Sequence, residues 1–420
     1  MNRVLLVGDD GSRSSAGAGA GACIARTKRF STALESSGLP FTICSPSEGS
    51  EGRKEILELL SNESFSSIVA ISPFPAEAAA LADPGIPLWI DLNGMHPAEI
   101  QLLKGHDGRD GERILRMLSL ENSLLLKGDI FSTPSARQSF AVLGELLLLG
   151  RELSFSDGLA PVVPLPHCAN GFSGVGGISA KPFKVISTGS FNRWFDHSTL
   201  FDCIEKAMNR NAELVFEVTG GRTPFCKEKY DEFLEMVEGS SHRDRYLLHG
   251  WVPESELQEV YRSASAAVYT DIRCPETLLG ARTRALDWIS RGIPVVCTEG
   301  AEISEEIQKN NLGIVVPGGD SSALANAIID LTDRPQLVES IRISQEEWCS
   351  HAGSSHFVFQ PLIRWCRHPI RLAGKAAGSP TVPSLNSFQY LRRLFRELSS
   401  SKSPEYAVKR LLSRMQRSFG

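Results

Sequence analysis

The stretch CPETLLGARTRALDWISRGIPVV (274–296) ends in an apolar strand, and the residues before that strand have the pattern of a helix that begins near Thr277 and covers a sheet. Charges on such a helix cost several kcal/mol unless they are paired or meet a ligand. The stretch nevertheless carries Glu276, Arg282, Arg284 and Asp287. One interpretation is an internal salt bridge between Arg284 and Asp287, which lie three residues apart. The other, which we favour, is a ligand whose hydroxyls meet carboxylates and whose phosphates meet arginines.

The same alternation of a short apolar strand and an amphipathic helix runs from RVLLVG (3–8) to GIVVPGG (313–319). Continuous apolar strands separated by helices are typical of a parallel sheet that is covered on both faces. The alternation stops once, in a segment rich in Pro and Gly (160–182), which indicates a linker. The sequence therefore predicts an α/β protein of two doubly wound, Rossmann-like domains that face each other across a cleft.

The predicted boundaries follow from this pattern. They are an N-terminal domain for the acceptor (1–165), a linker (166–182), a second domain that binds the donor (183–368) and a basic helical tail (369–420). Ligands of doubly wound sheets bind beyond the carboxyl ends of the strands, so we expect the site in the cleft between the domains.

Charge and cysteine content narrow the class of protein. The net charge of the 420 residues is -5, which does not indicate a nucleic-acid partner. Only the segment 370–420 is basic, with 10 Lys+Arg against 2 Asp+Glu. Its two amphipathic stretches predict either peripheral contact with an anionic membrane or a solvated extension.

The expected location is the cytoplasm. The nine cysteines occur singly, without CxxC or metal-ligand spacing, which favours reduced thiols. The start of the chain lacks the apolar region of a signal peptide. The longest apolar run, AVLGELLLLG (141–150), is too short to cross a bilayer and contains Glu145. We expect a cytoplasmic protein, with peripheral contact to the cytoplasmic membrane face as an open alternative.

Two loops of the second half have residues suited to a nucleotide. In TGSFNRWFD (188–196), Gly189, Arg193 and Trp194 follow a strand and precede a helix, where backbone amides and an arginine can bind a phosphate. In HGWVPESEL (249–257), Trp251 and Val252 lie where a loop backbone can contact a base, although a plain capped turn fits equally well.

The first half offers weaker candidates. The loop GDDGSRSSAGAGAGAC (8–23) is rich in glycine but lacks a usable GxGxxG or a P-loop, so it is weak support for dinucleotide binding. His96 follows the fourth predicted strand and faces the expected cleft, although a lone loop histidine often has no catalytic role. The sequence shows no Ser-His-Asp order and no cluster of metal ligands.

Four segments carry a resemblance to a known family. These segments are 189–196, 248–271, 275–300 and 313–328, and they resemble the nucleotide-sugar domain of retaining GT-B glycosyltransferases of group 1, the family-4-like class. The first half is similar more loosely, so the resemblance covers roughly residues 1–368. The segment RTRALD (282–287) is similar to that of a divergent bacterial subgroup.

The resemblance implies roles for the charged residues. Glu276 matches the carboxylate that contacts the hydroxyls of the sugar, and Asp287 matches the one that holds the ribose. The family usually has seven residues between them, whereas this chain has ten and lacks the GFG loop. Arg193 approximates the phosphate-binding arginine, and Arg282 or Arg284 is expected to supply the other cation. The catalytic candidates are thus Glu276, Arg193 and His96, and the donor-binding candidates are Gly189, Trp194, Trp251, Val252, Arg282, Arg284 and Asp287.

The implied function is transfer of a sugar from a nucleoside diphosphate sugar to a glycan or lipid-linked acceptor, with retention and without a metal or other cofactor. A role in cell-surface polysaccharide or glycolipid synthesis is expected. Two alternatives stay open: a catalytically silent partner subunit, suggested by the altered carboxylate spacing, and another GT-B enzyme such as a nucleotide-sugar epimerase.

Overall fold

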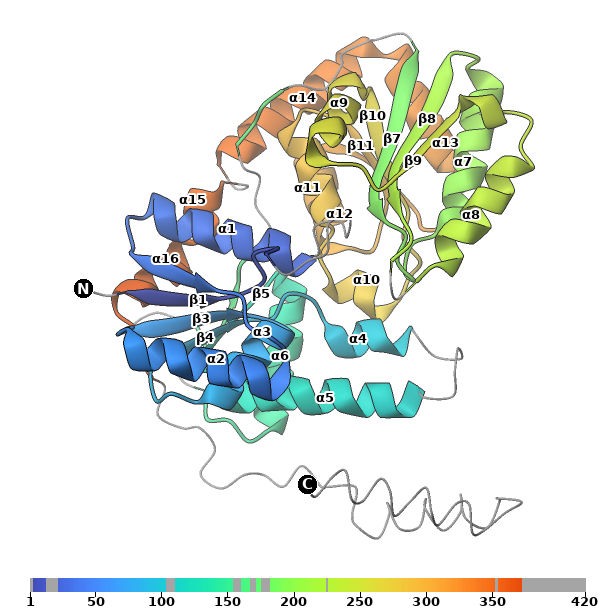
Figure 1. The fold of residues 1–420 in the computed structure, drawn as a ribbon. Helices are drawn as coiled ribbons and strands as arrows, with labels where there is room; N and C mark the ends of the chain where they lie inside the picture. Colours follow the sequence, from blue (N-terminus) through green and yellow to red (C-terminus); the bar gives the residue numbers. More distant parts are fainter. Residues whose placement is uncertain are drawn as a thin grey trace, which may run out of the picture.

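The computed structural model describes residues 3–12, 22–102, 110–153, 160–166, 171–174, 182–223, 226–351 and 354–371. These residues form two α/β domains, each built on a six-stranded sheet in which every strand pair is parallel (Figure 1). The predicted class, two doubly wound domains, is confirmed.

The first sheet has the strand order β2-β1-β3-β4-β5-β6. Its strands are mostly apolar because helices cover both faces. Helix α1 lies on one face, and α2, α3, α5 and α6 lie on the other. The elements are β1 Val4–Val7, α1 Ala22–Ser36, β2 Phe41–Cys44, α2 Gly49–Asn62, β3 Ser67–Ile71, α3 Phe74–Ala82, β4 Leu88–Asp91, α4 His96–Gln101, α5 Asp110–Lys127, β5 Ile130–Thr133, α6 Ala136–Leu148 and β6 Val162–Pro164.

The second sheet has the order β12-β11-β10-β7-β8-β9 and encloses one continuous core. Its elements are β7 Phe183–Ser190, α7 His197–Arg210, β8 Leu214–Gly221, α8 Glu228–Glu238, a 3-10 turn Arg243–Arg245, β9 Tyr246–Gly250, α9 Glu254–Ser263, β10 Ala266–Tyr269, α10 Pro275–Leu279, α11 Thr283–Ser290, β11 Val295–Thr298, α12 Glu302–Lys309, β12 Gly313–Val316, α13 Ser321–Asp333 and α14 Pro335–Ser350.

After α14 the chain returns to the first domain. Helices α15 (Ser355–Val358) and α16 (Gln360–Arg367) lie beside α1 (Figure 1). The ring centroids of Phe30 and Phe359 are 5.0 Å apart, and those of Trp89 and Trp365 are 5.5 Å apart. The predicted range 183–368 counts this segment with the second domain, whereas its aromatic side chains belong to the core of the first.

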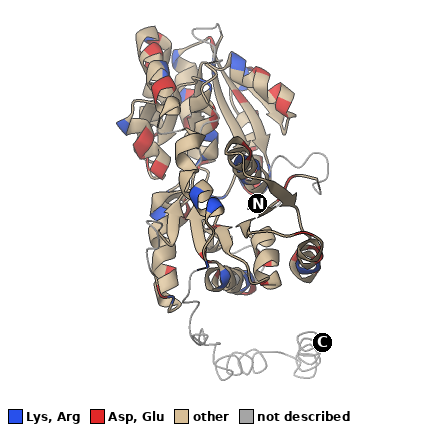
Figure 2. Cartoon of the chain, turned by 90° about the vertical axis from the view of Figure 1, so that its left-hand side faces the viewer, with Lys and Arg blue, Asp and Glu red and all other residues tan. Residues whose placement is uncertain are grey.

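Lys and Arg side chains as well as Asp and Glu side chains occur on helices of both domains (Figure 2). Within the described ranges, no helix combines the length and the apolar character needed to span a membrane. Most of the predicted tail (372–420) and the centre of the glycine-rich loop (13–21) lie outside the described residues.

Candidate functional site

The loops that follow β7, β10 and β11 form one cluster at an edge of the second sheet. Backbone bonds join the first two loops: Ile272 N donates to Trp194 O at 2.8 Å, and Asp196 N donates to Thr270 O at 3.0 Å. Asp271 N donates to the Thr298 hydroxyl of β11 at 3.0 Å. Helix α10, which follows the second loop, packs against α4 and α6 of the first domain (Figure 1). The cluster therefore borders the interface between the domains, where the sequence predicted the site.

A buried triad of charged side chains lies at the centre of this cluster. Arg282 donates from Nη1 and Nη2 to the two oxygens of Glu276, at 3.1 and 2.8 Å, and from Nε to Asp271. Only about 5% of each of these three side chains is exposed. The Arg282 guanidinium also lies 5.5 Å from the centre of the Trp194 ring. Asp271 was not among the predicted site residues, although its place at the end of a predicted strand was a signal for it.

The triad affects the protonation of its members. Burial raises the pKa of Glu276 to about 7, even though Arg282 opposes the shift. Burial works against the charged form of Arg282, but the two carboxylates outweigh it and raise the pKa of the guanidinium. The Arg282 guanidinium thus binds two carboxylates in a place from which water is excluded.

The triad also corrects the predicted helix. A single helix that begins near Thr277 is wrong: α10 ends at Leu279, and α11 begins at Thr283. The chain breaks there because Arg282 turns inward to Glu276, and the carboxylate of Glu276 occupies the space beside Gly280. A Cβ at Gly280 would lie 2.4 Å from Glu276 Oε1.

Arg284 lies on the opposite side of this break, against the end of β7. Its Nη2 donates to Ser190 O at 2.8 Å, and its Cζ lies 3.6 Å from where a Cβ would stand on Gly189. Gly189 has φ +94, a conformation that favours glycine, so the guanidinium can lie flat on the backbone. Its Nη1 is buried and has no hydrogen-bond partner within the described part of the chain. An arginine with an unused donor therefore lies at the carboxyl end of a central strand.

Asp287 follows Arg284 by three residues on α11, but it does not point at that arginine. Its Oδ1 is 3.9 Å from Nη1 of Arg291 in the second domain and 3.7 Å from Nη2 of Arg29 on α1 in the first domain. Its side chain is 44% exposed. The salt bridge between Arg284 and Asp287, the first interpretation of the opening stretch, is therefore not formed, and Asp287 instead faces the first domain.

Arg193, a catalytic candidate, and the donor candidates Trp251 and Val252 lie toward β8 and β9. Arg193 is 3.7 Å from Glu228 of α8. Trp251 is exposed and donates from Nε1 to the carbonyl of Arg222 at 2.9 Å, and Val252 beside it is half-buried. These contacts of Arg193 and Trp251 are with Glu228 and Arg222 rather than with the triad, whereas the ring of Trp194 lies beside Arg282.

His96 lies in the interior of the first domain, at the start of α4. Its Nδ1 is 3.4 Å from Glu121 Oε2. Burial is the largest single effect on the pKa of His96 and lowers it, but the hydrogen bond to Glu121 and the charges of Glu121 and Glu99 together outweigh burial, and the pKa is raised. Burial also raises the pKa of nearby Glu145 to about 7, with the charge of Glu121 as a second cause. His96 thus has the environment of a paired, internal histidine.

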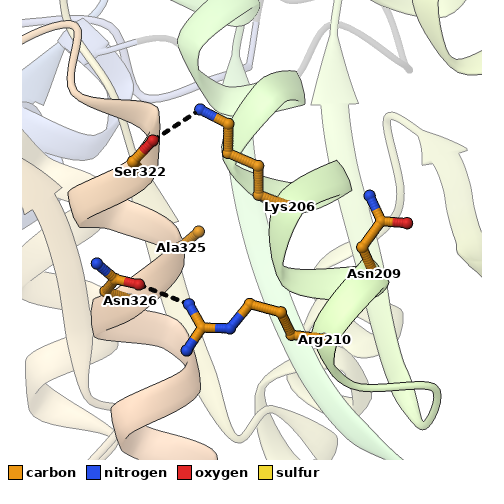
Figure 3. A pocket seen from close by; sticks show the side chains of 6 residues that line it. All are labelled: Lys206, Asn209, Arg210, Ser322, Ala325 and Asn326. Carbon is orange, nitrogen blue, oxygen red and sulfur yellow. Dashed lines mark hydrogen bonds between the residues drawn. The ribbon is translucent and has the colours of Figure 1, made fainter.

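The described residues contain no group of three or more His, Cys, Asp or Glu arranged to hold a metal ion. A hollow of about 290 Å³ lies between α7 and α13 (Figure 3). Its Lys206 and Arg210 are already hydrogen-bonded to Ser322 and Asn326 across it, at 2.9 and 2.5 Å. No predicted site residue lines this hollow.

Comparisons with known proteins add to this picture. Residues 182–334 match the model of the family described as "Glycosyl transferases group 1". No curated protein sequence matches the chain. Among solved structures, a sucrose-phosphate synthase from Thermosynechococcus elongatus is 14% identical with a TM-score of 0.65, and the match covers 87% of this chain and 98% of that one.

Two further structures carry ligands. HepE from Anabaena in complex with UDP-glucose is 16% identical with a TM-score of 0.57, over 87% of this chain and 98% of that one. An α,α-trehalose-phosphate synthase (UDP-forming) from Burkholderia xenovorans in complex with glucose-6-phosphate is 14% identical with a TM-score of 0.54, over 75% of this chain and 76% of that one. The resemblance noted in the sequence is therefore confirmed: the second domain matches the group 1 glycosyl transferases, and the two domains together have the GT-B fold of glycosyltransferases.

Proposed function

We propose that the protein transfers a glycosyl group from a nucleoside diphosphate sugar to an acceptor hydroxyl, with retention of the anomeric configuration. The family match to the second domain and the likeness to a structure that holds UDP-glucose support a donor of this class. In the reaction, the bond between the anomeric carbon and the diphosphate oxygen breaks, a bond to the acceptor oxygen forms on the same face, and the proton of the acceptor hydroxyl passes to the leaving diphosphate. The anomeric form of the product, measured by NMR, tests the retention.

The position of Arg284 is the observation that carries this proposal. Negative charge builds on the diphosphate as it leaves, so a fixed cation beside it lowers the barrier. Arg284 is held at the end of β7 by Ser190 O and keeps one buried donor unused. A phosphate oxygen at this place would complete its hydrogen bonds. Gly189, which has no side chain between the backbone and this guanidinium, is proposed to let a phosphate bound by Arg284 approach the backbone closely.

Two carboxylates are proposed to hold the rest of the donor. Asp287 is half-exposed at the interface and can accept hydrogen bonds from the two ribose hydroxyls. Each oxygen of Glu276 accepts one hydrogen bond from Arg282, which leaves lone pairs for a hydroxyl of the sugar. The contacts of Arg282 are used within the triad, so Arg284 is the better of the two arginines for the diphosphate.

We further propose that the reaction needs no metal or other cofactor, since an arginine and backbone amides would stabilise the leaving group. Turnover that survives treatment with EDTA would support this, and loss restored by Mg²⁺ would contradict it. The proposed acceptor is a glycan or lipid-linked sugar for the cell surface, and the proposed location is the cytoplasm, with the basic tail at the membrane face. Mass analysis of the product made from extracted lipids tests the acceptor.

A variant of Arg284 tests the central assignment. Release of nucleoside diphosphate is measured over a set of UDP- and GDP-sugars, and UDP binding is measured by calorimetry. We expect Arg284→Gln to reduce turnover by about 10²–10³ and to weaken UDP binding, because one stabilising contact is lost. Arg262→Gln on α9, an exposed arginine paired with Glu259, is the matched control and should behave as wild type. Wild-type turnover in Arg284→Gln would remove that residue from the site.

A second candidate is a partner subunit that binds the nucleotide but does not catalyse transfer. The observation that favours it is the triad, in which Glu276 is already bound to Arg282. This candidate predicts UDP binding that depends on Arg284 without release of diphosphate from any donor. Turnover by the wild-type protein would exclude it.

A further inference from the structure

A second set of contacts, beside the triad, joins the two domains. It links the start of α6 in the first domain to the start of α12 and the end of α10 in the second (Figure 1). Ala136 N and Arg137 N, the first two amides of α6, each donate to one oxygen of Glu302, both at 2.9 Å. The Ser135 hydroxyl donates to Leu279 O at 2.6 Å.

The side chain of Arg137 extends this set. Its Nη1 donates to Gly300 O at 2.6 Å and to Leu278 O at 3.3 Å, and its Nη2 pairs with Glu305. Arg137 thus contacts both chain segments of the second domain that adjoin the site. One is the loop after β11, and the other is the end of α10, which carries Glu276.

We propose that Glu302 is a positioning residue that holds the two domains in their closed arrangement and so excludes water from the donor. This inference rests on the proposed transfer function, because it concerns what reaches the anomeric carbon. Helix α6 begins three residues after β5 ends, at the carboxyl edge of the first sheet, and α12 begins four residues after β11 ends. The contact between their starts therefore fixes the separation of the two edges between which the donor and the acceptor must meet.

The chemistry of the contact suits a closure that reverses. The first amides of a helix have no partner within the helix, and the helix dipole favours a carboxylate there. Glu302 meets this need for α6 while it also lies in the first turn of α12. If the domains separate, water can satisfy the amides and the carboxylate, so opening is not prevented. The bonds to Glu302 are charge-assisted and therefore favour the closed form.

The first experiment detects the contact without reference to catalysis. Amide hydrogen exchange is measured at the start of α6 in wild type, Glu302→Gln, Glu302→Ala and the control Glu305→Gln. Glu305 lies on the same helix and touches the same Arg137, but its bond reaches only the side chain. We expect Ala136 and Arg137 to exchange several-fold faster in both Glu302 variants and at the wild-type rate in Glu305→Gln. Unchanged exchange in the Glu302 variants would overturn the proposal.

The second experiment measures the consequence for the donor. With a donor that the wild type uses, transfer to the acceptor and hydrolysis of the donor by water are recorded separately. An open site admits water, so we expect Glu302→Gln to raise the ratio of hydrolysis to transfer several-fold and to lower kcat more than it changes the donor KM. A merely structural role would lower both reactions together and leave their ratio unchanged, and that result would overturn the proposal.

The two experiments separate failure of this inference from failure of the proposed function. Faster exchange in Glu302→Gln, with no turnover of any donor by wild type, would contradict the transferase and with it the role in water exclusion. Wild-type turnover with an unchanged ratio in Glu302→Gln would contradict the inference alone. Arg137→Gln, which removes the bonds to Gly300 and Leu278 but keeps the backbone amides, should raise the ratio in the same direction.

Discussion

Arg26 in the first domain and Arg282 in the second are both buried at the carboxyl edge of a sheet, and these two arginines have different surroundings. In the first domain, Arg26 is fully buried and binds both oxygens of Asp91, at 2.9 and 2.8 Å. In the second, Arg282 binds both Glu276 and Asp271. An aromatic ring lies close to each guanidinium, Phe30 at 4.9 Å from Arg26 and Trp194 at 5.5 Å from Arg282.

Arg26 and Arg282 differ in the number of carboxylates that they bind. Arg26 faces one carboxylate, so the formal charges balance, and it also donates to Leu165 O at 2.8 Å, just after the last strand of the first sheet. This pair secures the segment that leaves the domain. Arg282 faces two carboxylates, so the triad taken by itself has one negative charge in excess, and Asp271 also interacts with the charge of Arg284. A balanced buried pair is suited to holding the fold, whereas an unbalanced one retains a group that can change its protonation or accept a ligand.

The largest expected effect concerns the balanced pair. Arg26→Met leaves Asp91 buried without its cation and should destabilise the protein by about 3–5 kcal/mol, measured by urea unfolding. The double variant Arg26→Met with Asp91→Leu should recover much of this loss, because an apolar pair can replace a buried ion pair. Lys54→Ala on the surface of α2, whose side chain is 72% exposed, is the control and should change stability little. If Arg26→Met is as stable as the control, the pair does not hold the fold.

The triad should make the free energy of unfolding depend on pH. Burial raises the pKa of Glu276 from 4.5 to about 7, so between these values the folded protein binds more protons than the unfolded chain. Stability therefore falls as the pH rises through this range, and the full cost is present above about pH 7. Glu276→Gln cannot titrate, so the variant should gain about 2–3 kcal/mol relative to wild type between pH 5 and pH 8. Thermal unfolding of both proteins at the two pH values measures this difference, and an equal difference at both would contradict the assignment.

The sequence was sufficient for the sheets but not for the triad. Apolar runs such as those of β1 and β11 predict buried parallel strands because the signal lies in adjacent residues. The bond between Arg282 and Asp271 joins residues 11 apart and depends on a break at Gly280 that helical periodicity does not show. Of the residues singled out in the opening stretch, Asp287 pairs with Arg29 of the first domain. The partners of these residues were not predictable, since a charge on a helix carries no information about which of its neighbours will turn inward.

Contacts between the domains were even less predictable from the sequence than the contacts of the triad. Glu302 and Ala136 are 166 residues apart, and Glu302 resembles any other glutamate in the first turn of a helix. Likewise, the less favoured interpretation paired Asp287 with Arg284 because the two are neighbours on a helix, but the fold brings Arg29 of the first domain to Asp287. Both contacts depend on how the two sheets are placed relative to each other, which no local pattern encodes.

The smallest expected effect comes from removing the aromatic ring that lies beside Arg282 or the ring that lies beside Arg26. Trp194→Leu removes the ring beside Arg282 and should cost about 1 kcal/mol of stability, because a cation–π contact is lost while the backbone bond from Ile272 to the carbonyl of residue 194 remains. Phe30→Leu removes the corresponding ring beside Arg26 and also the packing on Phe359, so it should cost more stability.

The donor KM of the two variants should respond in the opposite order. It should rise in Trp194→Leu, whose ring orients the triad at the site, and stay at the wild-type value in Phe30→Leu. If both variants left the donor KM unchanged, or both raised it alike, the two buried arginines would have the same role, and the distinction between a pair that holds the fold and a triad that serves the site would be wrong.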